Sequence, residues 1–159
     1  MFRRLLLLIP LLPLLLAAFY ASPLFGQLVQ FPTAPLTIIT ASGSHRFTVE
    51  LATSPTQMIQ GLMFRQSLAP DAGMLFDYQA SSMASMWMKN TLIPLDMLFI
   101  GADGTVLDIH ERAVPLSLDP IGSDKPVLAV LELNGGTAAR LGIRSGDRVV
   151  FPIFGNAAN

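Results

Sequence analysis

The chain has 159 residues, a length that fits a single domain. Its 10 basic and 11 acidic residues give a formal net charge of -1, so the composition indicates no basic face for nucleic acid. The sequence contains no cysteine, which excludes a disulfide scaffold, a thiolate metal site and a cysteine nucleophile. The absence of thiols also suits an oxidising compartment.

Residues 1–26 have the pattern of a targeting segment. Arg3 and Arg4 form a positive start, and an apolar run follows over residues 5–19. The run is shorter than the roughly 20 residues that a membrane span needs, which favours a signal peptide. A membrane anchor stays open as the alternative, because residues 19–21 make a poor cleavage site. In both cases we expect the rest of the chain to lie outside the cytoplasm, in the periplasm or an equivalent extracytoplasmic space.

The remaining sequence predicts one β-rich domain over residues 36–155, reached through a proline-bearing linker at residues 27–35. Residues 36–40 are expected to be extended, and Gly43 begins a turn. Residues 45–52 then alternate between apolar and polar side chains. This period of two predicts a hairpin with one buried face.

A short helix is expected to follow the hairpin. Thr53 or Ser54, followed by Pro55, is a helix-start signal that combines a cap with a first-turn proline. Apolar residues then recur at helical spacing over residues 58–63. Gly61 weakens a helix at this point, and its presence indicates close packing.

The second half of the domain is predicted to consist mainly of short strands. The expected strands are residues 73–78, 86–91, 97–100, 106–110, 127–133 and 148–153. Residues 97–100 are uninterrupted by polar residues, so this strand should be buried on both faces. A second short helix is expected at residues 137–141, ended by Gly142. Together these elements predict a mainly β fold with two short helices and a compact antiparallel sheet, barrel-like or sandwiched.

Four sequence blocks follow one another along this domain. They are residues 61–65 (GLMFR), 73–76 (GMLF), 87–91 (WMKNT) with Pro94-Leu95-Asp96 and Phe99, and 131–133 (LEL) with Gly136 and Gly146-Asp147. In this order and spacing the chain resembles the bacterial and archaeal family called domain of unknown function 192, over roughly residues 36–153. The resemblance implies a compact β-rich domain that is often exported behind a leader. It implies no reaction, because the family is named for lacking one.

The tryptophan block is the densest group of polar and aromatic side chains. On a strand, Trp87, Lys89 and Thr91 would share one face, with Met88 and Asn90 on the other. As a pocket wall, Trp87 would stack on a ligand, Lys89 would bind an anion and Asn90 would form a two-sided hydrogen bond. The alternative is that Asn90 and Thr91 only bond the backbone of a turn.

Three charged residues complete the predicted binding surface, namely Arg65, Asp96 and Glu132. Arg65 either lies near a helix C-terminus, where the dipole stabilises a cation, or pairs with Glu132 or Asp96 to orient a carboxylate-bearing ligand. Asp96 follows Pro94 and could cap that bend or pair with Lys89 or Arg65. Glu132 stands between two leucines, so it faces either solvent or a cleft.

We predict a non-catalytic ligand-binding or envelope-accessory module, whose partner is an unknown small molecule or an envelope protein. The alternative is a small hydrolase-like enzyme that uses Asp96 and Glu132, with Asp71 or Asp77, as clustered carboxylates. No catalytic residue can be assigned. We expect no cofactor, no metal site and no nucleic acid, and membrane contact only through the N-terminal segment.

Two minor alternatives rest on local patterns. Thioethers are soft ligands for copper(I), so Met83, Met86 and Met88 beside Trp87 could bind this ion. Against this, Met86 and Met88 alternate like core residues. Residues 136–147 have the helix–turn–strand order of the end of a peptide-binding PDZ domain, but no carboxylate-binding loop precedes them.

Overall fold

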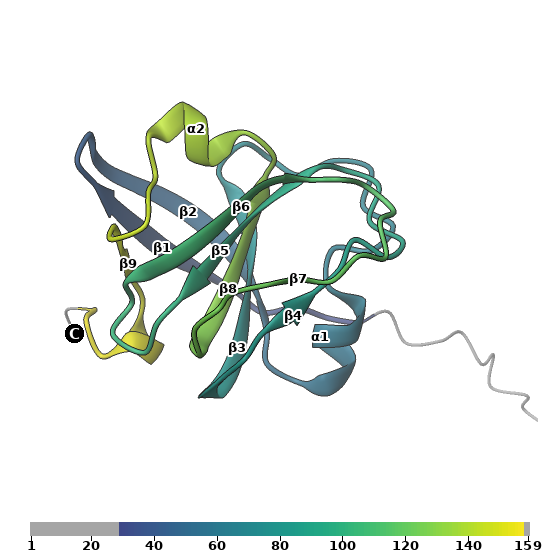
Figure 1. Cartoon of the computed structure of the whole chain (residues 1–159), viewed down its shortest axis with the longest axis horizontal. Helices are drawn as coiled ribbons and strands as arrows, with labels where there is room; N and C mark the ends of the chain where they lie inside the picture. The colour runs from purple at the N-terminus through teal and green to yellow at the C-terminus, as the bar shows by residue number, and fades with distance from the viewer. Residues whose placement is uncertain (1–28, 158–159) are drawn as a thin grey trace, which may run out of the picture.

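A curled sheet of seven strands forms the body of the domain, with the order β6-β5-β8-β3-β2-β1-β9 (Figure 1). The computed structural model describes residues 29–157. The predicted targeting segment, residues 1–26, lies outside this range. None of the described helices is long and apolar enough to cross a bilayer.

The regular elements confirm a mainly β fold with two short helices. The strands are β1 (Thr33–Thr40), β2 (Gly43–Ala52), β3 (Ala72–Ser82), β4 (Ser85–Met86), β5 (Leu95–Ile100), β6 (Val106–Ala113), β7 (Ile121–Gly122), β8 (Val127–Asn134) and β9 (Arg148–Val150). The helices are α1 (Pro55–Gln60) and α2 (Thr137–Leu141), and a 3-10 turn covers Pro152–Phe154. The seven-stranded sheet curls into a half-barrel, and β4 and β7 form a separate two-stranded ladder.

One strand pair departs from the expected antiparallel arrangement, because β2 and β3 run parallel. Antiparallel neighbours can be joined by a tight turn, whereas parallel neighbours need a crossover connection. The crossover here contains α1 and residues 61–71. This parallel pair is therefore what brings the α1 segment onto one face of the sheet (Figure 1).

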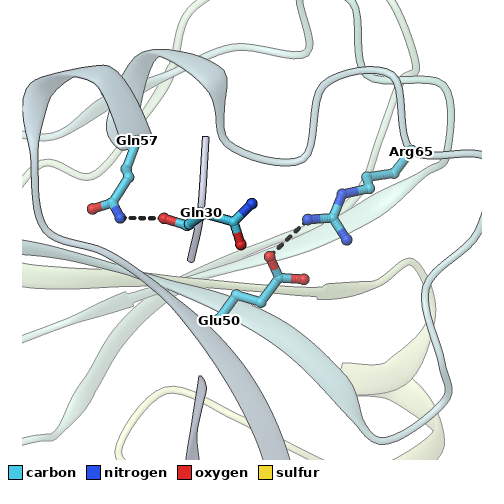
Figure 2. Close-up of polar contacts among 4 residues, drawn as sticks. All are labelled: Gln30, Glu50, Gln57 and Arg65. Carbon is cyan, nitrogen blue, oxygen red and sulfur yellow. Dashed lines mark hydrogen bonds and ion pairs between the residues drawn. The ribbon is translucent and has the colours of Figure 1, made fainter. Parts of the chain in front are cut away.

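Helix α1 begins at the predicted cap signal but ends before the apolar run at residues 58–63 is complete. Ser54 and Gln57 form a reciprocal capping box, and the Gln57 amide also donates to the carbonyl oxygen of Gln30 at 2.7 Å (Figure 2). The helix ends at Gly61, which has a φ of 46°. A side chain at Gly61 would lie 3.1 Å from a ring carbon of Phe76, so the expected close packing is confirmed.

The central strands are buried on both faces. Every residue of β5 is buried, which includes the apolar run at residues 97–100 that predicts burial on both faces. Because side chains alternate along a strand, neighbours enter two different cores. Leu131 and Leu133 of β8 belong to the core inside the half-barrel, whereas Val130 and Met97 belong to the core beneath α1.

The two edge strands of the sheet meet at one end of the half-barrel. The Val106 N–H donates to the Asp147 carbonyl and the Val149 N–H to the Gly104 carbonyl, both at 2.8 Å. Strand β9 is thus bonded to β1 on one side and to the start of β6 on the other. A PDZ domain needs an open sheet edge that accepts a peptide strand. Here β9 has a neighbour on both sides, so the PDZ-like interpretation of residues 136–147 is not supported.

Two expected boundaries are wrong. Residues 33–35, which we assigned to the linker, begin β1 and pair with β2. Residues 87–91, which we expected in a strand, form a turn after the two-residue strand β4. The turn arises because Asn90 takes a left-handed φ of 55° and the Thr91 N–H donates to the Met88 carbonyl at 3.0 Å.

Asp96 ties three elements together from the buried strand β5. Its carboxylate accepts backbone N–H bonds from Arg112 at 2.8 Å, from Gly136 at 2.9 Å and from Ala138 at 2.8 Å. Gly136 has no side chain with which to cap α2, so Asp96 supplies this cap from the neighbouring strand. It therefore neither caps the bend at Pro94 nor pairs with a cation.

Asp96→Asn should lower the free energy of unfolding by about 2 kcal/mol, because the new amide NH2 would face the Ala138 N–H. Asp96→Ala removes the acceptor for all three N–H groups and should cost about 3–5 kcal/mol. Urea unfolding followed by circular dichroism measures both changes, with the exposed Asp124→Asn as the matched control. Equal urea midpoints for Asp96→Asn and Asp124→Asn would contradict the structural role of Asp96.

Candidate functional site

A cavity of about 240 Å³ lies between α1, the turn at residues 87–91 and one face of the sheet. Its wall includes three methionines and three aromatic residues, namely Met58, Met63, Met86, Phe76, Tyr78 and Trp87. Lys89, Thr91 and Glu132 are among the polar residues that line it. The cavity is thus mainly apolar, with a few polar groups that converge on one space.

The fold supplies each wall from a different part of the chain. The crossover between β2 and β3 brings Met58 and Met63 over the sheet. Alternate residues of β3 place Phe76 and Tyr78 on the covered face. Glu132 lies opposite Met97 of β5 in the register of β8, so its side chain enters the core beneath α1.

Glu132 forms the most unusual part of this wall. It is only 4% exposed. In the described part of the chain, every side-chain oxygen or nitrogen that is cut off from solvent has a hydrogen-bond partner. The Glu132 carboxyl forms no hydrogen bond or ion pair there, so its oxygens open on the cavity. The alternative of a solvated Glu132 is therefore wrong, and the residue faces a cleft.

Burial sets the protonation of this carboxyl. Removal from water raises the pKa of Glu132 to about 8, so the empty cavity holds mostly the neutral acid at neutral pH. Burial, and to a smaller extent the negative charge of Glu132, also raises the pKa of Tyr78. These two groups therefore interact across the same space.

The tryptophan block contributes three of its five residues to the cavity. Trp87, Lys89 and Thr91 line it, although they come from a turn and not from a strand, and Asn90, which we expected in the wall, does not. The Lys89 ammonium lies 5.1 Å from the centroid of the Trp87 ring, a cation–π contact. Met88 is fully buried beside the cavity wall, and Asn90 holds the turn.

Arg65 has a partner that the sequence did not indicate. Its guanidinium pairs with the Glu50 carboxylate of β2 at 2.6 Å, so the expected pairing with Glu132 or Asp96 is wrong (Figure 2). The dipole alternative is wrong too, because α1 ends at Gln60, before Arg65. The ion pair instead fastens the crossover segment to the sheet.

The two acids of the proposed hydrolase point to opposite faces of the sheet. Asp96 is paired with Leu133 in the strand register, and Glu132 is paired with Met97. Partners in a register share a face and neighbours along a strand alternate, so the two carboxyls are separated by the sheet. Asp96 is also occupied by three backbone N–H groups. The structure therefore provides no Asp96–Glu132 pair for acid–base chemistry.

The methionines of the copper alternative do not face one space. Met83 is 61% exposed, Met86 lines the cavity, and Met88 is fully buried. The Met86 sulfur accepts the Tyr78 hydroxyl at 3.2 Å. Among residues 29–157, no three His, Asp or Glu side chains are grouped as they would be to hold a metal ion.

Sequence reasoning missed the residues that α1, its crossover and β3 contribute to the cavity, among them Met58 and Tyr78. Met58 was interpreted only as a core residue of the helix, and Tyr78 only as the end of a strand. Tyr78 could have been found from the period of two, because it follows Phe76 on the same face of β3. Met58 could not, because its place depends on the parallel crossover.

Comparison with known proteins gives one family and similar solved structures. The model of the DUF192 family, described as "Uncharacterized ACR", matches residues 37–151. A structure from Sinorhizobium meliloti 1021, described as a candidate transcription regulator, is 53% identical with a TM-score of 0.76, covering 79% of this chain and 98% of that chain. A protein of unknown function from Novosphingobium aromaticivorans DSM 12444 is 44% identical with a TM-score of 0.75, covering 81% and 89%. No curated protein matches the chain.

The free energy of unfolding should fall as the pH rises from 4.5 to 8, because Glu132 keeps its proton in the folded protein up to about 8. In this window unfolding releases the proton, so each pH unit should lower the free energy of unfolding by up to about 1.4 kcal/mol. Glu132→Gln should flatten the dependence, whereas the exposed control Glu111→Gln should keep it. Urea midpoints across this window measure the slopes, and identical slopes for wild type and Glu132→Gln would exclude the assigned protonation.

Proposed function

Since this chain belongs to the DUF192 family, which has no assigned reaction, we propose that it is a non-catalytic module that binds a small ligand outside the cytoplasm. The binding site is the cavity that Glu132 lines. The observation that carries the proposal is a buried carboxyl that opens on this cavity and has no partner among the described residues.

The lining of the cavity supports ligand binding. Ligand sites combine apolar walls with a few polar groups that fix orientation, and this cavity has both. Its volume of about 240 Å³ is small, so it fits a small molecule or one side group of a larger one. The half-exposed ring of Trp87 lies where an entering ligand would contact it.

The free-energy cost of burying Glu132 is a second argument for ligand binding. Burial disfavours the charged form of this carboxyl and raises its pKa to about 8, which makes an ionised Glu132 costly. An apolar residue would match its neighbours Met97 and Met74 in the same core and avoid this cost. A local conflict of this kind is typical of a functional position. A ligand that bonds the carboxyl would recover the loss.

The geometry favours binding over hydrolysis. Among the described residues that line the cavity, Glu132 is the one carboxyl. Hydrolysis by two carboxylates needs both beside the same substrate, and Asp96 lies on the other face of the sheet. The site therefore offers recognition groups without the acid–base pair.

The N-terminal sequence supports an extracytoplasmic location. Arg3 and Arg4 before an apolar run are typical of a signal peptide or an anchor, and a chain without cysteine suits an oxidising compartment. The Sinorhizobium relative is described as a candidate transcription regulator. We do not extend this description to the present chain, because a net charge of -1 offers no electrostatic footprint for DNA.

A thermal-shift screen of the purified protein against small polar molecules should reveal ligands that raise its melting temperature, because a ligand of the native state stabilises it. The same ligands should change the fluorescence of Trp87, the single tryptophan, which lines the cavity. Glu132→Gln should reduce both signals, and Glu111→Gln should keep them. Ligand shifts of equal size in all three proteins would place the site elsewhere.

The double variant Arg3→Glu with Arg4→Glu should remain in the cytoplasm, because it reverses the positive charge of the targeting segment. Protease added to spheroplasts should digest the wild-type protein and spare this variant. A control with Arg140→Glu and Arg144→Glu makes the same charge change on the exposed surface and should be digested. Protection of the wild-type protein would rule out an extracytoplasmic location.

A further inference from the structure

We propose that the cavity takes a small organic cation, a protonated amine whose ammonium group pairs with the Glu132 carboxylate. This inference rests on the proposed function and names the chemical class of its ligand. It follows from the hydrogen-bonding groups that the cavity leaves unused, from the rings around them and from the distribution of charge.

The hydroxyl protons of two lining residues are already used within the protein. The Tyr78 hydroxyl donates to the Met86 sulfur at 3.2 Å, and the Thr91 hydroxyl donates to the Lys89 carbonyl at 3.3 Å. A hydroxyl has one proton, so these two oxygens can only accept further hydrogen bonds. The polar groups left to a ligand at Tyr78 and Thr91 are therefore acceptors.

Glu132 adds the strongest acceptor. An ionised carboxylate only accepts hydrogen bonds, through two oxygens, whereas a primary ammonium group offers three donors and no acceptor. A bond between the two is charge-assisted and stronger than a neutral one. The ligand that best satisfies this site therefore brings both donors and positive charge.

The apolar walls also suit a cation. Phe76, Tyr78 and Trp87 line the cavity, and the faces of aromatic rings attract positive charge. The molecule already places one ammonium group on such a face, since Lys89 lies 5.1 Å from the centroid of the Trp87 ring. The thioether of Met63 is soft and polarisable and also lies in the wall.

The positive charge of Lys89 repels a bound cation less than the Glu132 carboxylate attracts it. Lys89 is exposed, so water and salt screen its charge. Glu132 is buried, where the interaction between charges is much stronger. The nearby cation Arg65 is outside the lining and is paired with Glu50. A cation is therefore most strongly stabilised in the part of the cavity next to Glu132.

Binding of a cation must remove the proton of Glu132. In the empty cavity burial raises the pKa of this carboxyl to about 8, and an ammonium partner favours the ionised form. The complex therefore forms with release of one proton at lower pH. The observed affinity should rise about tenfold per pH unit up to the pKa of the empty site and then level off.

Three probes with the same butyl chain test the class of ligand, namely butylammonium, butan-1-ol and butyrate. Calorimetry and Trp87 fluorescence measure their binding to the purified protein on both sides of pH 8. Butylammonium should bind with the expected pH dependence, and its heat should vary with the ionisation enthalpy of the buffer, which reports the released proton. Butan-1-ol and butyrate should bind at least about tenfold more weakly, since neither carries a positively charged donor.

Variants assign the effect to the carboxylate. Glu132→Gln should weaken butylammonium binding at least about tenfold and abolish its pH dependence, because the amide carries no charge. Glu111→Gln should change neither. Lys89→Gln should leave the affinity equal or higher, because it removes a positive charge from the wall. A loss with Lys89→Gln as large as that with Glu132→Gln would overturn the proposal.

The outcomes separate this inference from the proposed function. Suppose that butan-1-ol or butyrate binds as tightly as butylammonium, and that Glu132→Gln weakens the binding of that probe. The cavity then binds a ligand that is not a cation, and only this inference fails. If butylammonium does not bind while the thermal-shift screen finds a neutral or anionic ligand, the same conclusion holds. If no molecule of any charge binds in a Glu132-dependent way, both fail.

Discussion

The burial of β8 on both faces is the constraint from which the site follows. This strand lies between β3 and β5, and packed side chains cover each of its sides. Strand alternation sends Leu131 and Leu133 into one core and Glu132 into the other. A polar residue on such a strand cannot reach bulk water, so it must find a partner or border a cavity. The crossover between β2 and β3 covers this face and leaves a cavity beside Glu132.

Asp96 and Glu132 are two buried acids on neighbouring strands with opposite surroundings. Asp96 accepts three backbone N–H groups, so its side-chain oxygens have partners and hold α2 against β5 and β6. Glu132 has no such donors, and burial alone acts on it. Both positions carry a buried carboxyl group. The difference lies in the donors, and it separates a structural acid from one that is available to a ligand.

Local patterns in the sequence predicted much of the fold, whereas the partners of the site residues depend on long-range contacts. The cap at Ser54 and the buried strand β5 could be read from adjacent residues. The position of Glu132 between two leucines predicted that it faces away from their core. It could not predict what covers the other face, because that depends on the parallel pairing of β2 and β3. The Arg65–Glu50 ion pair joins residues 15 apart and has no local signal.

A backbone hydrogen bond joins two of the segments that border the cavity. The Phe64 N–H donates to the Asn90 carbonyl at 2.9 Å, which joins the crossover to the turn at residues 87–91. Both residues have left-handed φ values, of 63° and 55°, a conformation that costs non-glycine residues about 1–2 kcal/mol each. This strain and the buried acid both lie on the α1 side of the sheet. The three bonds of Asp96 lie on the opposite side. Packing and hydrogen bonds inside the half-barrel can therefore offset the strain on the side of the sheet that carries the cavity.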